Sequence, residues 1–281
     1  MLKLISSDFN LAQVNHAFAM TCDLYNGYFP GYKSCNIEYH DLRHTTDTFL
    51  AMARLIHGAV CDGEELNNRL IALALITALL HDSGYIQEDF DNEGTGAKHT
   101  TSHVRRSMDF LKRHGAHLEL SDDEITAGRA MILCTDLAVD INSIEFPSDR
   151  VELFGKMLGT ADLLAQMADR TYLEKLLFLY REFKWAGVGG YESEVDLLRK
   201  TVGFFDYIGN RLETALGKTD RYMILHFDSR WNIQKNLYHE AIEKQKEYLR
   251  AILKMPDSHH RDHLKRDGIV NVVRKKYGTI F

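Results

Sequence analysis

The sequence LIALALITALL, residues 70–80, is the longest apolar run of the chain and leads directly into His81 and Asp82. The run is too short for a membrane-spanning helix, which takes roughly 20 apolar residues, and it fits a helix buried in a protein core. A carboxylate buried without a partner beside such a run would be costly. Because metal coordination would offset that cost, the stretch predicts both a core helix and a metal site at its end.

Apolar residues also recur at helical spacing on both sides of this run. They follow three-, four- and seven-residue steps within residues 42–56 and recur again within residues 153–180. The chain contains only three prolines, which permits long helices over most of its length. We find no convincing set of segments with the period of two that is typical of strands. The sequence therefore predicts an all-α fold, with one multi-helix domain at residues 1–255 and a polar, basic tail at residues 256–281.

Composition and charge narrow the class of protein. The 281 residues are 45% hydrophobic, which is enough for one large domain with a sizeable core. A net charge of −6 gives no support for binding to nucleic acid or to a membrane surface. The four cysteines form no Cys-x-x-Cys pair, and the N-terminal residues do not resemble a secretory signal. We therefore expect a cytoplasmic protein with reduced thiols.

Local signals mark where helices begin and end. The sequence SDDE, residues 121–124, has the pattern of a capping box, which begins a helix. Gly84 follows the apolar run closely enough to end its helix. The polar segment 89–98 predicts a loop beside the expected metal site.

Two other segments carry side chains that can bind a metal ion. His40 and His44 lie four residues apart in YHDLRH, residues 39–44, so on a helix they would face the same way. Asp162 follows three small residues in a helical stretch, which would let its short carboxylate reach inward. Together with the pair after the apolar run, these residues offer imidazole and carboxylate groups without a thiolate. That combination suits a hydrolytic divalent metal better than a structural zinc ion.

At these residues the chain resembles the HD superfamily of metal-dependent phosphohydrolases and, within it, the catalytic domains of class I cyclic-nucleotide phosphodiesterases. Those enzymes carry a Tyr-His-Asn-x-x-His segment, a His-Asp pair on a buried helix, an Ala-Thr-Asp-Met segment and a distant Asp. Residues 39–44 match the first segment with Asp41 in place of Asn, and residues 134–137 (CTDL) resemble the third. The resemblance covers roughly residues 36–185.

The resemblance implies a site for one or two divalent metal ions, held by His44, His81, Asp82 and Asp162. It implies that Asp82 bridges the ions if two bind, which gives it a part in catalysis, and that His40 donates a proton to the leaving oxygen. Two ions about 3.5–4 Å apart would hold the attacking and leaving oxygens of an in-line displacement. Manganese, magnesium, iron, nickel and zinc can all occupy such sites, so the identity of the metal stays open.

Four further residues are candidates for a second metal ion or for a supporting role. His103 fits the place where the family has a histidine that helps the water shell of the second metal, and His99 could be a direct ligand, as in the HD-GYP branch. The alternative for both is a solvent-exposed start of a helix. Thr135 and Asp136 could orient bound water or a ligand histidine, or simply cap a helix.

Other polar residues have simpler explanations. Asp169 follows Asp162 by seven residues and is expected to pair with Arg170 or Lys175 rather than with a metal. The tail is expected to lie in solvent, together with its histidines His259, His260 and His263.

The identity of the substrate is the most open part of the prediction. The cyclic-nucleotide enzymes hold the base with a Gln and a nearby Phe in their C-terminal helices, and no such pair occurs in the expected region here. Gly84-Tyr85 also lacks the proline of the Gly-Tyr-Pro motif in cyclic-di-GMP hydrolases. We expect a phosphodiesterase that hydrolyses a small phosphate ester, a cyclic or signalling nucleotide, with metal-activated water. The alternatives are a nucleotidase or other phosphomonoesterase with the same site, and a catalytically inactive HD-fold binding module.

Overall fold

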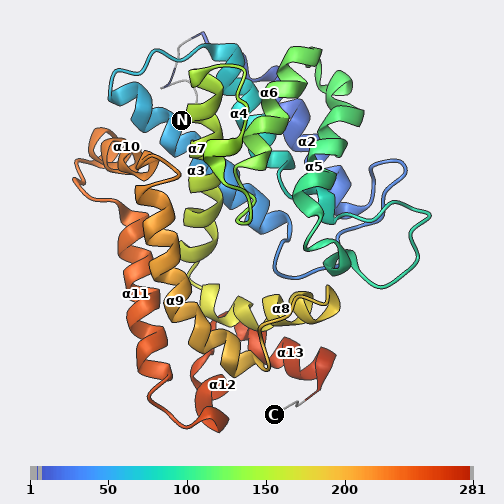
Figure 1. Ribbon diagram of the computed structural model, residues 1–281, viewed down its shortest axis with the longest axis vertical. Coiled ribbons are helices and arrows are strands. Elements are labelled where there is room, and N and C mark those ends of the chain that lie inside the picture. Colours follow the sequence, from blue (N-terminus) through green and yellow to red (C-terminus); the bar gives the residue numbers. More distant parts are fainter. Residues whose placement is uncertain (1–4, 6–7, 279–281) are drawn as a thin grey trace.

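The computed structural model describes residue 5 and residues 8–278, and the regular elements within them are all helices (Figure 1). The α-helices are α2 (Ala12–Asn26), α3 (Leu42–Cys61), α4 (Asn68–Leu80), α5 (His103–His114), α6 (Asp122–Leu133), α7 (Asp149–Ala168), α8 (Tyr172–Trp185), α9 (Glu194–Glu213), α10 (Tyr222–Trp231), α11 (Leu237–Ile252), α12 (His260–His263) and α13 (Ile269–Tyr277). Short 3₁₀ turns lie between some of them. The predicted all-α fold is confirmed.

The apolar run of residues 70–80 forms most of α4, and every residue from Ile71 to Leu80 is buried. The helix begins where the side chain of Asn67 accepts hydrogen bonds from the backbone amides of Arg69 and Leu70. It packs against α2, α3, α6 and α7, so its end lies deep in the molecule. Among the described helices, none is long and apolar enough to cross a membrane.

Side-chain caps fix the start of the helices that surround α4. The predicted capping box of α6 is present, because Ser121 and Glu124 bond to each other's backbone amides. At α3 the carboxylate of Asp41 accepts a hydrogen bond of 2.9 Å from the amide of His44. At α7 the hydroxyl of Ser148 accepts from the amide of Val151. Each cap sets the residue at which the helix begins, and therefore the direction in which its side chains point.

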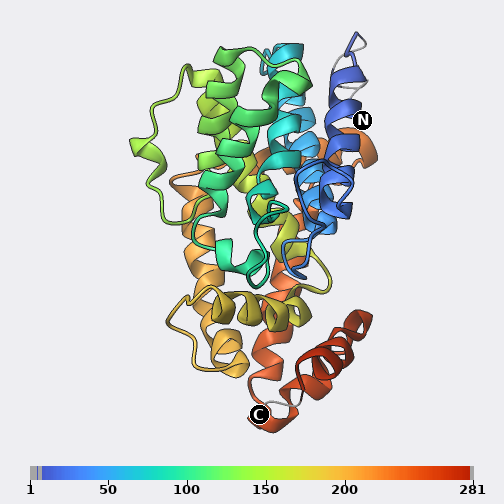
Figure 2. The same cartoon turned by 90° about the vertical axis from the view of Figure 1, so that its right-hand side faces the viewer.

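The helices form two regions along the long axis of the molecule. In both views α2 to α7 lie in the upper part, while α8, α9, α12 and α13 lie in the lower part (Figures 1 and 2). Helix α11 runs beside α9 and also packs against α7, which joins the two regions. One large hydrophobic core extends from Phe9 to Val273.

Gly84 has a structural role different from the one expected. Helix α4 ends at Leu80, before Gly84, which lies in the 3₁₀ turn Ser83–Tyr85. A Cβ atom on Gly84 would lie 2.0 Å from the carbonyl oxygen of His103, so only glycine lets α5 pack this closely against the turn. The close contact places the start of α5 beside the end of α4, where the expected metal ligands are.

The segment after Pro256 differs from the solvent-exposed tail expected from the sequence. Its residues form α12 and α13, and α13 packs against α8. Leu264 and Val273 are fully buried, and the buried side chain of His260 bonds through Nε2 to the carbonyl of Met255 at 2.9 Å. Helical spacing of apolar residues within this polar segment explains its packing, since a narrow apolar face is enough to dock a short helix.

Candidate metal centre

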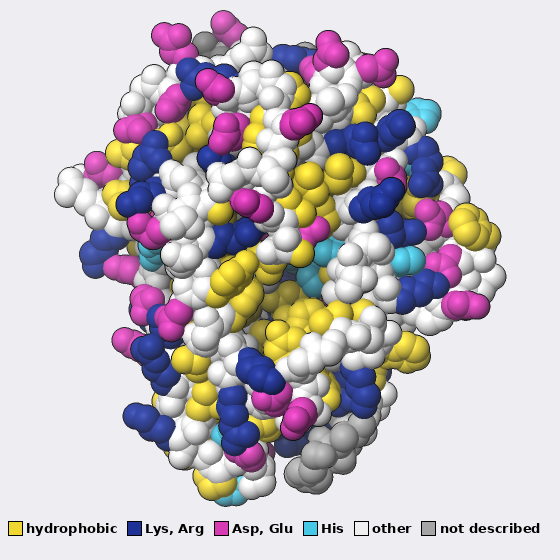
Figure 3. Space-filling model, viewed as in Figure 1, with side chains coloured by type: hydrophobic (Ala, Val, Ile, Leu, Met, Phe, Trp, Pro, Cys, Tyr) yellow, Lys and Arg dark blue, Asp and Glu magenta, His cyan; other side chains and the backbone are white. Residues whose placement is uncertain are grey.

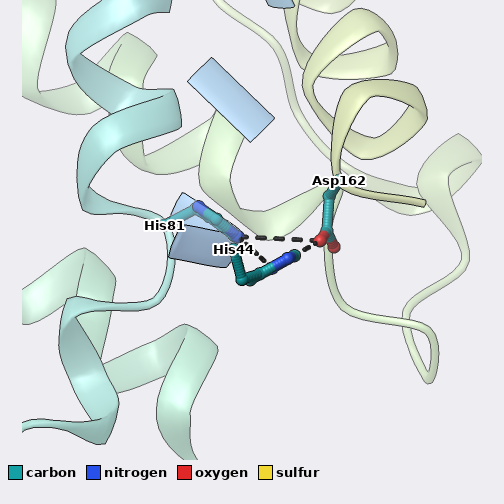
Figure 4. A group of neighbouring side chains, drawn as sticks. All are labelled: His44, His81 and Asp162. Atoms are coloured by element: carbon teal, nitrogen blue, oxygen red, sulfur yellow. Dashed lines mark hydrogen bonds and ion pairs between the residues drawn. The ribbon is translucent and has the colours of Figure 1, made fainter. Parts of the chain in front are cut away.

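Three helices bring the four predicted ligands to one point. His44 lies in the first turn of α3, His81 and Asp82 directly follow α4, and Asp162 lies within α7. Figure 4 shows the rings of His44 and His81 and the carboxylate of Asp162 pointing toward one another. These three residues form a group that could hold a metal ion, with one ligand atom from each all within 4.8 Å of one another.

The distances between ligand atoms fit coordination of a single ion. The Nε2 atoms of His44 and His81 lie 3.4 Å apart. Asp162 Oδ1 is 3.1 Å from the first and 3.6 Å from the second. Ligand atoms about 2.1 Å from a common ion lie roughly 3.0–3.4 Å apart when they are adjacent in octahedral or tetrahedral geometry. The group therefore needs little rearrangement to bind an ion.

Asp82 adds a fourth potential ligand atom, a carboxylate oxygen, beside this group. Its Oδ2 lies 3.2 Å from His44 Nε2 and 3.3 Å from His81 Nε2. This oxygen is buried, and no described residue makes a well-aligned hydrogen bond with it. A buried carboxylate oxygen without such a bond is costly unless another group binds it. A cation between Asp82 and the two histidines would supply that partner.

The backbone of α4 determines which ring nitrogen of neutral His81 carries the hydrogen. Its Nδ1 lies 2.9 Å from the carbonyl oxygen of Ala78 and donates its hydrogen there. In the neutral ring this leaves the lone pair on Nε2, the atom that faces His44 and the carboxylates. Ligand histidines in metal sites commonly donate their other ring N–H to a carbonyl in this way. The helix end thus presents His81 as a ready ligand.

The charges in this cluster favour a cation. Burial alone would lower the pKa of His44, but Asp162 and Asp82 outweigh it and raise that pKa to about 9. Burial likewise opposes the charged form of Asp82, yet the positive charge of His81 beside it holds the pKa of this carboxyl well below its usual range. Protons on the two imidazoles therefore balance the carboxylates, and a metal ion would bind by displacing them.

His40 lies outside α3, which corrects the expectation that it shares a helix face with His44. The helix begins after Asp41, whose side chain caps it, so His40 belongs to the preceding loop. Its Nδ1 lies 2.7 Å from Oε2 of Glu182, and Oε1 of the same carboxylate accepts from the amide of Tyr39 at 2.8 Å. Glu182 is buried in α8. The carboxylate holds both the ring and the backbone of the loop, and it leaves Nε2 of His40 as the ring atom for a ligand.

Aromatic rings connect His40 with His103. The ring of Tyr85 stacks on both histidines, with centroid distances of 4.4 Å in each case. His103 Nδ1 donates to the carbonyl of Thr100 at 2.6 Å, while its Nε2 lies 3.6 Å from Asp82 Oδ1. The structure thus places His103 beside the predicted ligands, on the side of Asp82 away from His44.

Three other candidates have local partners instead. His99 Nε2 lies 3.4 Å from Oδ2 of Asp91 in the loop 89–98, and the structure does not bring it to the ligand cluster. Thr135 and Asp136 line the same cavity as Asp82, but the Thr135 hydroxyl donates to the carbonyl of Ile132 and Asp136 Oδ1 accepts from the amide of Ala138. Both contacts are local hydrogen bonds of the turn that follows α6.

Asp169 forms an ion pair, as the sequence predicted. Its Oδ2 lies 2.9 Å from Nζ of Lys175, the second of the two expected partners. The Arg43 guanidinium is also near, at 3.8 Å from Oδ1. Asp169 is therefore paired with the side chains of Lys175 and Arg43 and does not belong to the candidate metal-binding group.

A cavity of about 430 Å³ opens beside the cluster, between the upper and lower helices. Asp82, Asp162, His40 and His103 line one end, whereas His44 and His81 lie behind them. Figure 3 shows a hollow in this face, with histidine at its upper edge and hydrophobic side chains below. The side chain of Asp162 is 13% exposed while that of His81 is 1% exposed, so a ligand in the cavity would reach the ion from the Asp162 side.

Two residues of this site escaped the sequence-based prediction. Glu182 is separated from His40 by 142 positions, and nothing in the surrounding sequence distinguishes it from the other charged residues of α8. Gln166 lies one helical turn after Asp162 and accepts a hydrogen bond from the hydroxyl of Tyr39 at 2.9 Å. The four-residue spacing from Asp162 predicts that Gln166 shares its helix face, but it assigns Gln166 no role in the site.

Metal binding is expected to stabilise the protein. Zn²⁺, Mn²⁺ or Ni²⁺ at 100 times its Kd should raise the melting temperature of chelator-treated protein by about 5 °C or more, because the ion binds only the folded cluster. Differential scanning fluorimetry measures the shift, and EDTA should reverse it. The exposed tail residue His259 supplies the control, since His259→Ala should keep the shift. An equal shift in His44→Ala would place the ion elsewhere.

The buried group of His44, His81 and Asp162, with Asp82 beside it, could thus hold a metal ion beside a large cavity. A histidine held by a carboxylate lines the same cavity. No protein-family model, no curated protein and no solved structure matches this chain.

Proposed function

We propose that the protein is a metal-dependent phosphoric ester hydrolase that prefers phosphodiesters. The observation that carries the proposal is the position of His40, which lines the cavity together with Asp82 and Asp162 and is held by Glu182 at 2.7 Å. A metal cluster alone would also suit a binding protein. A histidine poised beside it supplies the proton that a poor leaving group needs, and this favours catalysis.

The ligand cluster fits a divalent ion, since it combines two imidazoles and two carboxylates. One of the carboxylate oxygens, Asp82 Oδ2, is buried without a well-aligned hydrogen bond. When bound, such an ion supplies Lewis acidity toward a phosphoryl oxygen and lowers the pKa of water. His44, His81, Asp82 and Asp162 would hold it. The choice among first-row metals stays open, because mixed imidazole and carboxylate sites accept several of them.

The protein's own groups would orient the ester and move the proton. Glu182 accepts a hydrogen bond from Nδ1 and fixes the His40 ring, so Nε2 would be the atom that faces the leaving oxygen. His103 beside Asp82 would hold water or a phosphoryl oxygen by hydrogen bonding through Nε2. An alkoxide leaves from an alkyl phosphodiester only with a proton, so His40 matters most for this substrate class.

We further propose that the enzyme acts in the cytoplasm on a small phosphate ester, with cyclic and signalling nucleotides among the substrates to be tested. All four cysteines are free in the structure, which agrees with a reducing compartment. This part of the proposal rests on the sequence resemblance and on the size of the cavity, not on a contact specific for a nucleotide.

A hydrolysis screen tests the proposal. Protein loaded separately with Mn²⁺, Zn²⁺ or Ni²⁺ should release p-nitrophenol from bis-p-nitrophenyl phosphate, and more slowly from p-nitrophenyl phosphate. Cyclic nucleotides belong in the same screen. Faster hydrolysis of the monoester would favour a phosphomonoesterase. Stoichiometric metal without turnover of any ester would contradict the enzymatic proposal.

A further inference from the structure

Helices α8 and α9 line the lower end of the cavity, below the histidines, α8 with a largely apolar face and α9 with two apolar and two polar side chains. In α8, Tyr172, Leu176, Leu179 and Phe183 line it at steps of four, three and four residues. This spacing places them on one side of the helix. The facing side of α9 contributes the residues Leu197, Lys200, Thr201 and Phe204. This part of the cavity wall therefore consists of side chains that are spaced along one side of each helix.

Part of this apolar wall is left uncovered by other described residues. Leu179, Phe183 and Phe204 remain partly exposed, although each belongs to a helix face that points into the molecule. Figure 3 shows hydrophobic side chains gathered in the hollow below the histidine. Contiguous apolar surface facing water is unfavourable, and in a concave site it is typical of a ligand pocket.

Two polar side chains of α9 at this end, Lys200 and Thr201, already have hydrogen-bond partners. Lys200 donates through Nζ to Asp196 Oδ2 at 2.7 Å and to the carbonyl of Gly190 at 2.6 Å. The Thr201 hydroxyl donates to the carbonyl of Leu197 at 2.8 Å, one turn earlier in α9. Each edge group of a nucleobase that is buried here without a partner would cost about 1–3 kcal/mol, a cost that an alkyl or aryl group does not incur.

The other end of the cavity has the opposite character. Asp82, Asp162, His40 and His103 lie there, and Gln166, one helical turn after Asp162 in α7, also lines the cavity. Gln166 accepts from the hydroxyl of Tyr39 through Oε1, so its amide nitrogen is the group left to donate to an anionic oxygen. The cavity thus has a polar end suited to a phosphate and an apolar end suited to a hydrocarbon.

We infer that the substrates are amphiphilic phosphate esters, with the phosphate at the metal cluster and an alkyl or aryl group between α8 and α9. The inference rests on the proposed hydrolase function and names its substrate class. The reaction is hydrolysis: water adds to phosphorus and gives up one proton to solvent, the bond between phosphorus and the leaving oxygen breaks, and His40 donates a proton to that oxygen and regains one from solvent. The alkyl or aryl group seated between α8 and α9 belongs to the ester group that stays on the phosphate or to the one that leaves.

Two matched series of probes test the inference. The first is methyl, butyl and octyl p-nitrophenyl phosphate, used below micelle-forming concentrations, which share one leaving group and differ only in the chain. The second is the corresponding alkylphosphonates, which cannot be hydrolysed and whose binding to metal-loaded protein is measured by calorimetry. Transfer of one methylene from water to an apolar site should improve kcat/KM and Kd about fourfold until the chain fills the cavity.

Variants of the apolar wall locate the effect. Leu179→Ala in α8 and Phe204→Ala in α9 should each reduce the octyl-to-methyl ratio of kcat/KM by about tenfold or more, because each removes several buried carbon atoms from the contact. Ile224→Ala is the matched control, since Ile224 is an exposed apolar residue of α10 that does not line the cavity. It should leave the ratio unchanged.

The outcomes separate the inference from the proposed function. Hydrolysis of all three esters without dependence on chain length would overturn the inference and leave the hydrolase function standing. A cyclic nucleotide turned over more efficiently than the octyl ester would also overturn it. Phosphonate binding that strengthens with chain length, without turnover of any ester, would support the apolar site and contradict the hydrolase. Equal octyl-to-methyl ratios of kcat/KM in Leu179→Ala, Phe204→Ala and the wild type would show that the octyl group binds outside this cavity.

Discussion

Asp82→Ala is expected to lose its metal ion and its hydrolytic activity together. The Oδ2 atom lies 3.2 and 3.3 Å from the two ligand imidazoles, and a methyl group cannot replace it. Loss of a residue that only supports a ligand typically weakens metal affinity about 10–100-fold, so loss of a direct ligand should weaken it by at least about 100-fold. Without the ion, kcat/KM on bis-p-nitrophenyl phosphate should fall by about 10³-fold or more.

Elemental analysis of purified Asp82→Ala and its rate of hydrolysis of bis-p-nitrophenyl phosphate test this prediction. His16→Ala is the control, because His16 is an exposed histidine of α2 and should keep both metal and activity. Circular dichroism establishes that each variant is folded. Full metal occupancy and full turnover in folded Asp82→Ala would show that the cluster is not the active centre.

His40→Ala is expected to keep the metal and lose the chemical step. The residue lies outside the ligand cluster, and general acid catalysis typically contributes about 10²–10⁴-fold. The rate should fall by that factor for a dialkyl phosphate, whose alkoxide must be protonated. For bis-p-nitrophenyl phosphate the loss should be much smaller, since p-nitrophenolate leaves without a proton.

Glu182→Gln tests whether Glu182 positions the His40 ring for this step. Gln keeps the size of the side chain but replaces the carboxylate that accepts the 2.7 Å hydrogen bond from His40 Nδ1. The rate of Glu182→Gln should therefore fall more for a dialkyl phosphate than for bis-p-nitrophenyl phosphate, as in His40→Ala, but by a smaller factor. An equal loss on both classes of ester in His40→Ala, or a loss of bound metal, would show that His40 is structural or a ligand and that it is not the acid.

Much of the fold could be predicted because it depends on local patterns. The apolar run of residues 70–80 has no hydrophilic face, so it had to form a fully buried helix. The capping box at Ser121 and Glu124 could also be predicted, because it depends on only four consecutive residues. The convergence of His44, His81 and Asp162 was predicted by the order of their segments, although the sequence contains no distance information.

The features that could not be predicted depend on contacts between distant segments. Glu182 reaches His40 only because α8 crosses below the ends of α3 and α7 (Figure 1). The position of His40 in a loop follows from Asp41, which caps α3 instead of continuing a helix. Asp91 draws His99 into the loop 89–98, so a four-residue spacing from His103 did not place the two histidines on one site.

Helix α8 has a consequence for how this protein could diversify. Glu182 at its end holds the His40 ring, while Leu176 and Leu179 on the same helix face the cavity. Insertion of one residue within the helix would shift everything beyond it by about 1.5 Å and rotate it by about 100°. Relatives of this protein should therefore vary the cavity by exchanging single side chains of α8 and should accept insertions in the loop 186–193, leaving the length of the helix fixed.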